Sequence, residues 1–446
     1  MKSLALKIFL PLAILAVLTL ALMPKVIGAS IESAIIDNLL AQIPPEAQSQ
    51  FEIRHTEFSN DWFSSSTTIE LIYTPIGIDA IALSMDFDID HGPLLQTEDG
   101  LSIGLAYAMI QPSIRNDMFD IAIADLSFPL PDITLNLLAR FDQTLTLEVN
   151  VSELSFSDIK GRISFDGLNA NFDIAHDQSA YFSVKMGELS ATENAANSNV
   201  LITGMTLTSS TTQMNDILAK TRTTLSVPSI SSTLPLPFSI SNIGIDYCLQ
   251  ASPGEENFSD IYQTIRLASI ESEIPVSSFS WLSEIKQVNN ELLRNYYKVL
   301  SELQNEINTD ADALSENLTE LGQELYLLVL QSLVEFNNRI EVNSYDGDHT
   351  ADLNILWAGL DTLNTIAELD INAVIAALNI TLDISLDLEA ILSSPLAGLV
   401  DPYMQEGYLT VSNGRVMMEA SMQNSVLTVN GDELPLDQFF ETQRDK

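Results

Sequence analysis

Most of the chain alternates apolar and polar residues with a period of two, which predicts β-strands that have one face in water. The clearest stretch is residues 145–151, where four aliphatic residues alternate with threonine, glutamate and asparagine. The same period recurs from residue 51 to about residue 274, interrupted by turns rich in serine, threonine and proline, such as 226–237. We therefore expect residues 28–284 to form a β-rich region built on an extended antiparallel sheet.

The period changes to that of a helix near residue 283. Apolar residues recur every three or four positions in residues 293–307 and 314–336, on either side of a polar break that contains Thr309 and Asp310. Either residue can cap the second helix, because its side-chain oxygen accepts from free backbone amides. We expect an antiparallel helical hairpin at residues 285–339 that packs on the sheet. A partner-binding or membrane-surface face is less favoured, since the polar sides carry few basic residues.

The remainder, residues 340–446, predicts a smaller α+β region. We expect a short helix, a strand, a helix interrupted at Pro395 and a last strand at residues 371–378, 382–388, 388–404 and 426–429. Between them, Asn413-Gly414 suits the positive φ values of a type I′ hairpin turn. The predicted fold class is α+β, mainly an antiparallel extended β-sheet with an antiparallel helical hairpin and an N-terminal membrane anchor.

That anchor is expected in residues 1–27. Residues 8–23 are uncharged and largely aliphatic, and Lys2 and Lys7 precede them. The run is shorter than the ~20 residues that span a bilayer comfortably, so it suits a signal peptide or a short signal-anchor. A signal cleaved after Ala29 requires a small residue at position 27, where the chain has Ile27. This favours an anchor over a cleaved signal or a buried helix. The two lysines keep the amino end in the cytoplasm, leaving the bulk of the chain outside.

Composition limits the partners. The chain has 19 Lys and Arg residues against 61 Asp and Glu residues, a formal charge of −42, which argues against binding nucleic acid through a basic patch. The excess of acid most simply serves solubility, with an acidic docking surface as the alternative. Cys248 is the only cysteine, so no intramolecular disulfide can form.

No motif for catalysis or metal binding is recognisable. The four histidines are scattered, and the chain lacks a nucleophile elbow, a dinucleotide-binding turn and a phosphate loop. Asp86, Asp88 and Asp90 alternate along a predicted strand, which sets carboxylates in a row rather than around a calcium ion. We expect no cofactor, no metal and no enzymatic activity, with an unrecognised hydrolase as an alternative.

Short motifs near both ends of the chain carry a family resemblance. They lie at residues 61–65, 89–93, 407–409 and 427–436. The candidate residues, of unknown role, are Asp61, Trp62, Phe63, Ser64, Ser65, His91, Gly92, Pro93, Gly407, Tyr408, Asn430 and Gly431. Together they resemble the YdgA-like bacterial envelope proteins, which contain a domain of unknown function numbered 945. The resemblance implies a single membrane anchor, a large extracytoplasmic β-rich body and no established activity.

Each motif also has a structural explanation. Trp62 and Phe63 suit a plug in the core between strands, and His91-Gly92-Pro93 suits a rigid turn in which glycine supplies an unusual φ. The chain departs from the family at Asp432-Glu433, where a basic residue is common.

The function expected from these observations is binding or scaffolding in the periplasm by a non-enzymatic protein that crosses the bacterial inner membrane once. Its expected partners are the inner membrane, through the N-terminal segment, and a lipid or an envelope protein. A sharper alternative is lipid binding or lipid transfer along an apolar groove of the extended sheet.

Overall fold

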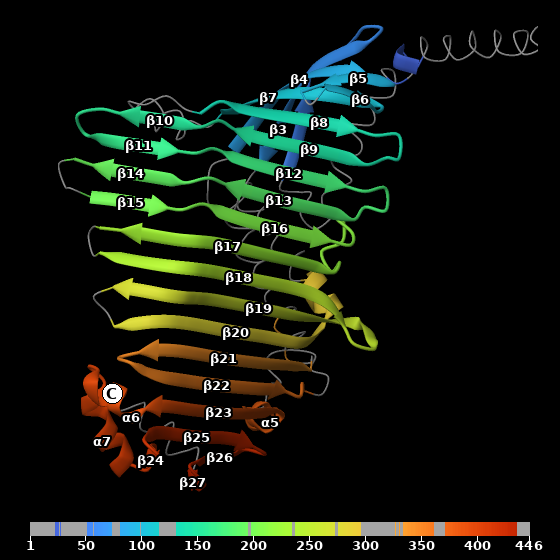
Figure 1. Ribbon diagram of the computed structural model, residues 1–446. Helices are drawn as coiled ribbons and strands as arrows, with labels where there is room; N and C mark the ends of the chain where they lie inside the picture. Colours follow the sequence, from blue (N-terminus) through green and yellow to red (C-terminus); the bar gives the residue numbers. More distant parts are fainter. Residues whose placement is uncertain are drawn as a thin grey trace, which may run out of the picture.

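The computed structural model describes residues 23–25, 27, 51–56, 58–73, 81–98, 100–115, 131–194, 198–233, 237–272, 275–295, 326, 330, 333–360 and 371–434. These residues form a 25-stranded antiparallel sheet and a separate two-stranded sheet, β5 with β6 (Figure 1). The predicted antiparallel extended sheet is therefore confirmed.

The strands follow one another through the sheet in near-sequential order. The N-terminal strands are β1 (Phe51–His55), β2 (Ser59–Asn60), β3 (Ser64–Tyr73), β4 (Ile81–His91), β5 (Leu94–Thr97), β6 (Gly100–Ile103), β7 (Ala106–Arg115), β8 (Ile133–Ala139) and β9 (Leu145–Val151). The middle strands are β10 (Leu154–Ser157), β11 (Gly161–Phe165), β12 (Leu168–Ile174), β13 (Ala180–Met186), β14 (Leu189–Glu193), β15 (Ser198–Ile202), β16 (Met205–Thr211), β17 (Thr221–Ser232), β18 (Phe238–Ser252), β19 (Glu255–Ser272) and β20 (Val276–Asn289).

The C-terminal elements complete the sheet and cover its last strands. They are β21 (Val334–Ser344), β22 (Gly347–Trp357), α5 (Ile371–Ala377), β23 (Leu378–Asp387), α6 (Leu388–Ser393), α7 (Ala397–Gln405), β24 (Thr410–Ser412), β25 (Arg415–Gln423), β26 (Val426–Val429) and β27 (Asp432–Leu434). Figure 1 shows the strands stacked like rungs, with β3 and β4 near one end and β25 to β27 at the other.

A line of interruptions crosses the middle of the sheet. Strands β9, β12, β13 and β16 pair side by side in one column, and β10, β11, β14 and β15 pair in a second column, as Figure 1 shows. Gly167 and Gly204 lie at these interruptions with φ values of 86° and 105°, a region that glycine adopts without strain. The long strand β17 pairs with both columns, and the long strand β18 pairs with β17 along its length. The first column also continues past β9 into β8 and β7.

Two hydrophobic clusters lie near the two ends of the sheet. The first consists of Ile69, Phe87, Ile89, Ala108 and Ile110, from β3, β4 and β7. The second consists of Ile391, Val400 and Val416, from α6, α7 and β25. Both form because a helix, a neighbouring segment or several strands cover the apolar side chains from water.

The predicted helical hairpin at residues 285–339 is wrong at both ends. β20 continues to Asn289 and β21 begins at Val334, and Ile285 pairs with Phe336 across these strands. Phe336 belongs to an alternating strand pattern, although its spacing from the preceding leucines also fits a helix. Residues 290–295, 326 and 330 are helical. The intervening part, with Thr309 and Asp310, lies outside the described residues.

The expected anchor also lies largely outside the described residues. Of residues 1–27, the structure describes only 23–25 and 27, which are helical. In the portion of the chain that is described, no helix has both the length and the apolar character needed to cross a membrane.

The C-terminal predictions are confirmed. The helix predicted at residues 388–404 is interrupted around Pro395, giving α6 and α7, and the Asp387 carboxylate caps α6 by accepting from the Ala390 amide at 3.0 Å. Asn413 and Gly414 both have positive φ, 52° and 74°, as a type I′ turn requires.

This turn gives a direct prediction. Replacing Gly414 with valine should lower the free energy of unfolding by about 1–3 kcal/mol, because a β-branched residue is strained at positive φ. Asn413→Gly is the control and should be nearly neutral, since glycine adopts the same φ freely. Urea unfolding of both variants measures the effect, and equal stability of the two would contradict the tight turn.

Candidate functional site: an apolar sheet face

One face of the sheet is apolar along nearly its whole length. Residues that pair across neighbouring strands point to the same face, so the register traces a single row of side chains. We call this row the central apolar row. From β3 to β25 it consists of Thr67, Phe87, Ile110, Leu135, Val149, Ala170, Val184, Leu207, Leu225, Ile245, Ile265, Trp281, Ile340, Ala351, Ile384 and Met418. At roughly 4.8 Å per strand, it extends over about 70 Å.

The opposite face is polar in the same strands. One residue along from the central apolar row, the register joins Asn171, Ser183, Thr208, Thr224, Asp246, Thr264, Leu282, Arg339, Asp352, Asp383 and Glu419. Its side chains bond across strands: the Thr224 hydroxyl donates to Asp246 at 3.0 Å, and Arg339 lies 3.6 Å from Asp352. Hydrogen bonds and ion pairs therefore satisfy the polar groups of this face, which is also compatible with water. The side chains of the apolar face form no hydrogen bonds with water.

Burial distinguishes the ends of the central apolar row from its middle. Phe87 and Ile110 belong to the first hydrophobic cluster and are each only 5% exposed. From Leu207 to Met418, every member of the row is half-buried or exposed, and Ile340 is 37% exposed. A long apolar strip thus lies between two closed clusters without being fully buried itself.

The two N-terminal motifs meet in the structure. Ser65 Oγ lies 2.7 Å from His91 Nε2, and the His91 amide donates to the Phe63 carbonyl oxygen at 2.8 Å. Ser64 pairs with Asp90 across β3 and β4. Ser65 and His91 are 5% and 4% exposed. Burial lowers the pKa of His91, opposed by the carbonyl oxygens of Trp62 and Pro24, which favour the protonated ring.

A serine hydrogen-bonded to a histidine is also the arrangement that activates a nucleophile. Here the serine is buried beneath its surroundings, and the buried Pro24 lies beside the histidine. A substrate would have to displace this packing to reach Ser65 Oγ. The geometry favours a structural role in which the pair joins β3, β4 and the segment that contains Pro24.

The lowered pKa of His91 predicts a pH dependence. Its pKa in the folded protein lies below the unfolded value of about 6.5, so the unfolded chain binds the proton more readily. The neutral ring therefore contributes stability that is fully present above about pH 6.5 and is lost as the pH falls toward the folded pKa. Urea unfolding at pH 7.5 and pH 5 should show a smaller pH difference for His91→Gln than for the unmodified protein. An unchanged difference would contradict the burial of a neutral ring.

The structure corrects our sequence-based interpretation of Trp62, Phe63 and Gly92. Trp62 and Phe63 are 47% and 63% exposed, so they do not plug the core. They follow β2 in the connection to β3. Gly92 does not have a positive φ; instead, a Cβ at this position would lie 1.8 Å from the Gly104 carbonyl oxygen. Glycine is needed at position 92 because two backbone segments approach closely.

The C-terminal motif residues form a separate group at the other end of the sheet. Asn430 Nδ2 donates to the Gly407 carbonyl oxygen at 2.8 Å, and Asn430 Oδ1 accepts from the Glu419 amide at 2.9 Å. Tyr408 contacts Tyr403 edge-on, with ring centroids 6.2 Å apart. Gly407, Asn430 and Gly431 all have positive φ. These contacts tie the end of α7 to the last hairpins, so the motifs mark two structural joints rather than one site.

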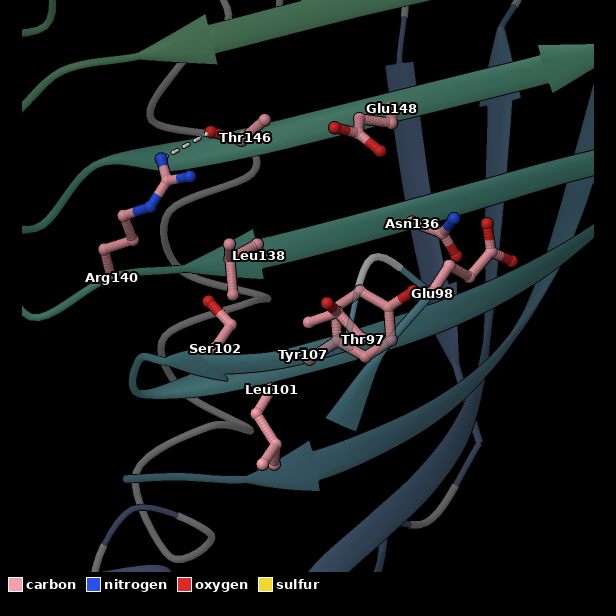
Figure 2. Close-up of a pocket in the computed structure, with 10 residues that line it drawn as sticks. All are labelled: Thr97, Glu98, Leu101, Ser102, Tyr107, Asn136, Leu138, Arg140, Thr146 and Glu148. Carbon is pink, nitrogen blue, oxygen red and sulfur yellow. Dashed lines mark hydrogen bonds between the residues drawn. The ribbon is translucent and has the colours of Figure 1, made fainter. Parts of the chain in front are cut away.

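A polar cavity of about 200 Å³ lies between the β5–β6 hairpin and the polar face of β7 to β9 (Figure 2). Glu98, Asn136 and Glu148 line it, and Arg140 donates to the Thr146 hydroxyl at 3.0 Å. A polar cavity of this size suits ordered water rather than an acyl chain.

Asp86, Asp88 and Asp90 are exposed in a row, as predicted, and within the described ranges no cluster of His, Cys, Asp or Glu is arranged to hold a metal ion.

The sequence predicted the alternation within each strand but not the continuous central apolar row. The alternation in each strand was visible, but the continuity of the row depends on the order and register of strands from distant parts of the chain. Those pairings place Leu207 beside Val184 and Leu225, and Trp281 beside Ile265 and Ile340.

The comparisons with known proteins agree with the motif resemblance. The family model described as "Bacterial protein of unknown function (DUF945)" matches residues 2–437. No curated protein and no solved structure matches the chain. Because the family model covers almost the entire sequence, including both motif groups, the chain belongs to the DUF945 family of bacterial proteins of unknown function.

Proposed function

We propose that this protein binds the acyl chains of lipids along the apolar face of its sheet, as a non-enzymatic protein anchored in the bacterial inner membrane with its sheet in the periplasm. The observation that carries the proposal is the central apolar row, whose members from Leu207 to Ile384 are half-buried or exposed between two closed clusters. Of the functions expected from the sequence, lipid binding accounts best for this row.

The chemistry of the face supports an acyl chain as the ligand. Contiguous apolar surface in contact with water is unfavourable by about 25 cal/mol per Å², so it is normally covered by another apolar surface. An acyl chain is long, narrow and without hydrogen-bonding groups, and it therefore requires no directional partner along the row. The polar opposite face and the charge of −42 keep such a sheet soluble while its apolar face holds lipid.

The proposed location has independent support in the sequence. Residues 8–23 are apolar, and Lys2 and Lys7 precede them, which favours a segment with its amino end in the cytoplasm. A reporter that is active only outside the cytoplasm should be active when fused after Lys446. Activity of a cytoplasmic reporter at the same position would contradict the periplasmic location.

Lipid binding is tested on the full chain extracted in mild detergent. After purification and extensive detergent exchange, mass spectrometry should detect phospholipid that remains with the protein and exceeds the amount carried by an unrelated single-span membrane protein prepared in parallel. Lipid at or below that background would refute the proposed function and favour scaffolding through a protein partner.

A further inference from the structure

Exposed large apolar side chains gather at the N-terminal end of the sheet. Leu94, Leu101 and Ile103 on the β5–β6 hairpin are 64%, 80% and 68% exposed, and Trp62 and Phe63 in the β2–β3 connection are 47% and 63% exposed. We call these five residues the tip surface. Large aromatic and aliphatic side chains that are exposed next to one another indicate an interaction surface, whereas single exposed apolar residues are common on any protein.

The hairpin presents its apolar face outward. Leu94 pairs with Ile103, and Leu101 pairs with Gln96, so all four residues lie on one side of the hairpin. On its other side, Leu95 is 1% exposed and packs near Gly104, while Thr97 and Ser102 line the polar cavity seen in Figure 2. The inner side of the hairpin thus already contacts the sheet. Leu101 borders the cavity as well but is 80% exposed, and Leu94 and Ile103 are likewise mostly exposed.

Backbone hydrogen bonds bring the aromatic residues to the same place. The Phe63 carbonyl oxygen accepts from the His91 amide at 2.8 Å, and Gly92, the next residue, donates to Leu105 at 2.7 Å. These bonds hold the β2–β3 connection at the point where the chain enters β5. Trp62 and Phe63 therefore border the hairpin that carries Leu94.

The segment that follows the apolar N-terminal run joins the fold at this point as well. Lys25 Nζ lies 3.3 Å from the carbonyl oxygen of Asn60 and 3.5 Å from its Oδ1, and Asn60 precedes Asp61-Trp62-Phe63. Ile27 packs against the first hydrophobic cluster. Residues 8–23, which we propose as the anchor, end only two residues before Lys25. A membrane that held them would lie close to the tip surface.

We propose that the tip surface inserts into the periplasmic leaflet of the membrane that holds the anchor. This inference rests on the proposed anchoring and adds a second attachment that orients the sheet. Tryptophan and phenylalanine suit the boundary between headgroups and acyl chains, and leucine and isoleucine suit the layer beneath. The central apolar row begins in β3 and β4 at the same end of the sheet, where the first hydrophobic cluster closes it.

The charged residues near the tip surface indicate which lipid headgroups it would meet. Asp61, Asp88 and Asp90 line one pocket beside the tip surface, and Glu98 and Arg140 line another. Lys25 bonds to Asn60, next to Asp61. Anionic headgroups would be repelled rather than attracted by these carboxylates. The tip surface therefore suits zwitterionic lipid, held by apolar contact that does not weaken at high salt.

The experiment uses the full chain reconstituted into zwitterionic phosphatidylcholine vesicles. In a Cys248→Ser background, Leu101→Cys is labelled with a polarity-sensitive fluorophore, and the vesicles contain lipids brominated on their acyl chains. Leu101 is 80% exposed, so the label leaves the packing intact. The matched control is Val426→Cys, which is 43% exposed in β26 at the far end of the sheet.

We expect the emission maximum of the label at position 101 to shift to shorter wavelength. The brominated acyl chains should quench this label at least several-fold more than the label at position 426, at both low and high salt. Absence of quenching at position 101, or equal quenching at both positions, would overturn the proposal. Lipid retained by the same protein in detergent is measured separately. Retained lipid without quenching at 101 refutes only the insertion of the tip surface, whereas quenching without retained lipid refutes only the binding of acyl chains along the sheet.

Discussion

Gly92→Ala is expected to prevent the protein from accumulating in cells. A Cβ at position 92 would lie 1.8 Å from the carbonyl oxygen of Gly104, far inside van der Waals contact. That carbonyl cannot easily move, because the Gly104 amide donates to Pro93 at 3.2 Å and the Leu105 amide donates to Ala139 at 2.8 Å. We expect a loss of about 3 kcal/mol or more in the free energy of unfolding, a large part of the stability of an ordinary domain.

Gly244→Ala is the matched control for this effect. Gly244 also lies in the sheet, in β18, but no atom lies within 4 Å of the position that its Cβ would occupy. Its φ is outside the left-handed region, so alanine should change the free energy of unfolding by less than about 1 kcal/mol. Immunoblots of cell fractions and urea unfolding of the purified variants provide the measurements. Accumulation of Gly92→Ala at the level of Gly244→Ala would refute the close backbone approach.

The strands were predictable because their signals are local. Residues 145–151 alternate in the sequence and form β9 with the same bounds, and residues 426–429 form β26. At Asn413-Gly414 the residue types match the required φ values. In each case the pattern that determines the structure lies within a few neighbouring residues, so no long-range information is needed.

The ends of the predicted helical hairpin were not predictable for a related reason. Phe336 continues a leucine spacing of three and four residues, yet it also alternates with Glu335 and Asn337 within β21. Its pairing with Ile285 and Ile355 in neighbouring strands favours the strand. A tertiary contact therefore overrides an ambiguous local period, as is common for short apolar runs.

The candidate residues illustrate the same limit. Ser65 and His91 are 26 positions apart, and only the pairing of β3 with β4 brings their side chains to 2.7 Å. The exposure of Trp62 and Phe63 has no signature in the sequence, because the same two residue types are common in cores. The need for glycine at position 92 comes from the Gly104 backbone twelve residues away, which no local turn rule includes.

A charge in the central apolar row should remove bound lipid. Leu207 is half-buried in β16, paired with Val184 on one side and Leu225 on the other. In Leu207→Asp, a lipid chain lying along the row would have to desolvate a carboxylate that has no partner, at a cost of at least about 1.4 kcal/mol, which corresponds to a tenfold loss of affinity. Mass spectrometry of the purified variant should therefore detect roughly tenfold less lipid per protein.

Thr206→Asp is the control in the same strand. Thr206 is exposed on the polar face and pairs with Lys185 and Ser226, so a new carboxylate there meets water and a cation. We expect this variant to retain its lipid and its stability.

The fate of Leu207→Asp also distinguishes an open face from a closed core. On an open face that holds lipid, the carboxylate reaches water once the lipid has left, and the variant accumulates and unfolds at nearly the same urea concentration as Thr206→Asp. In a closed core, the same carboxylate would be trapped without a partner and the variant would fail to accumulate. A variant that folds normally and retains as much lipid as the control would place the lipid elsewhere on the molecule and refute the central apolar row as its binding surface.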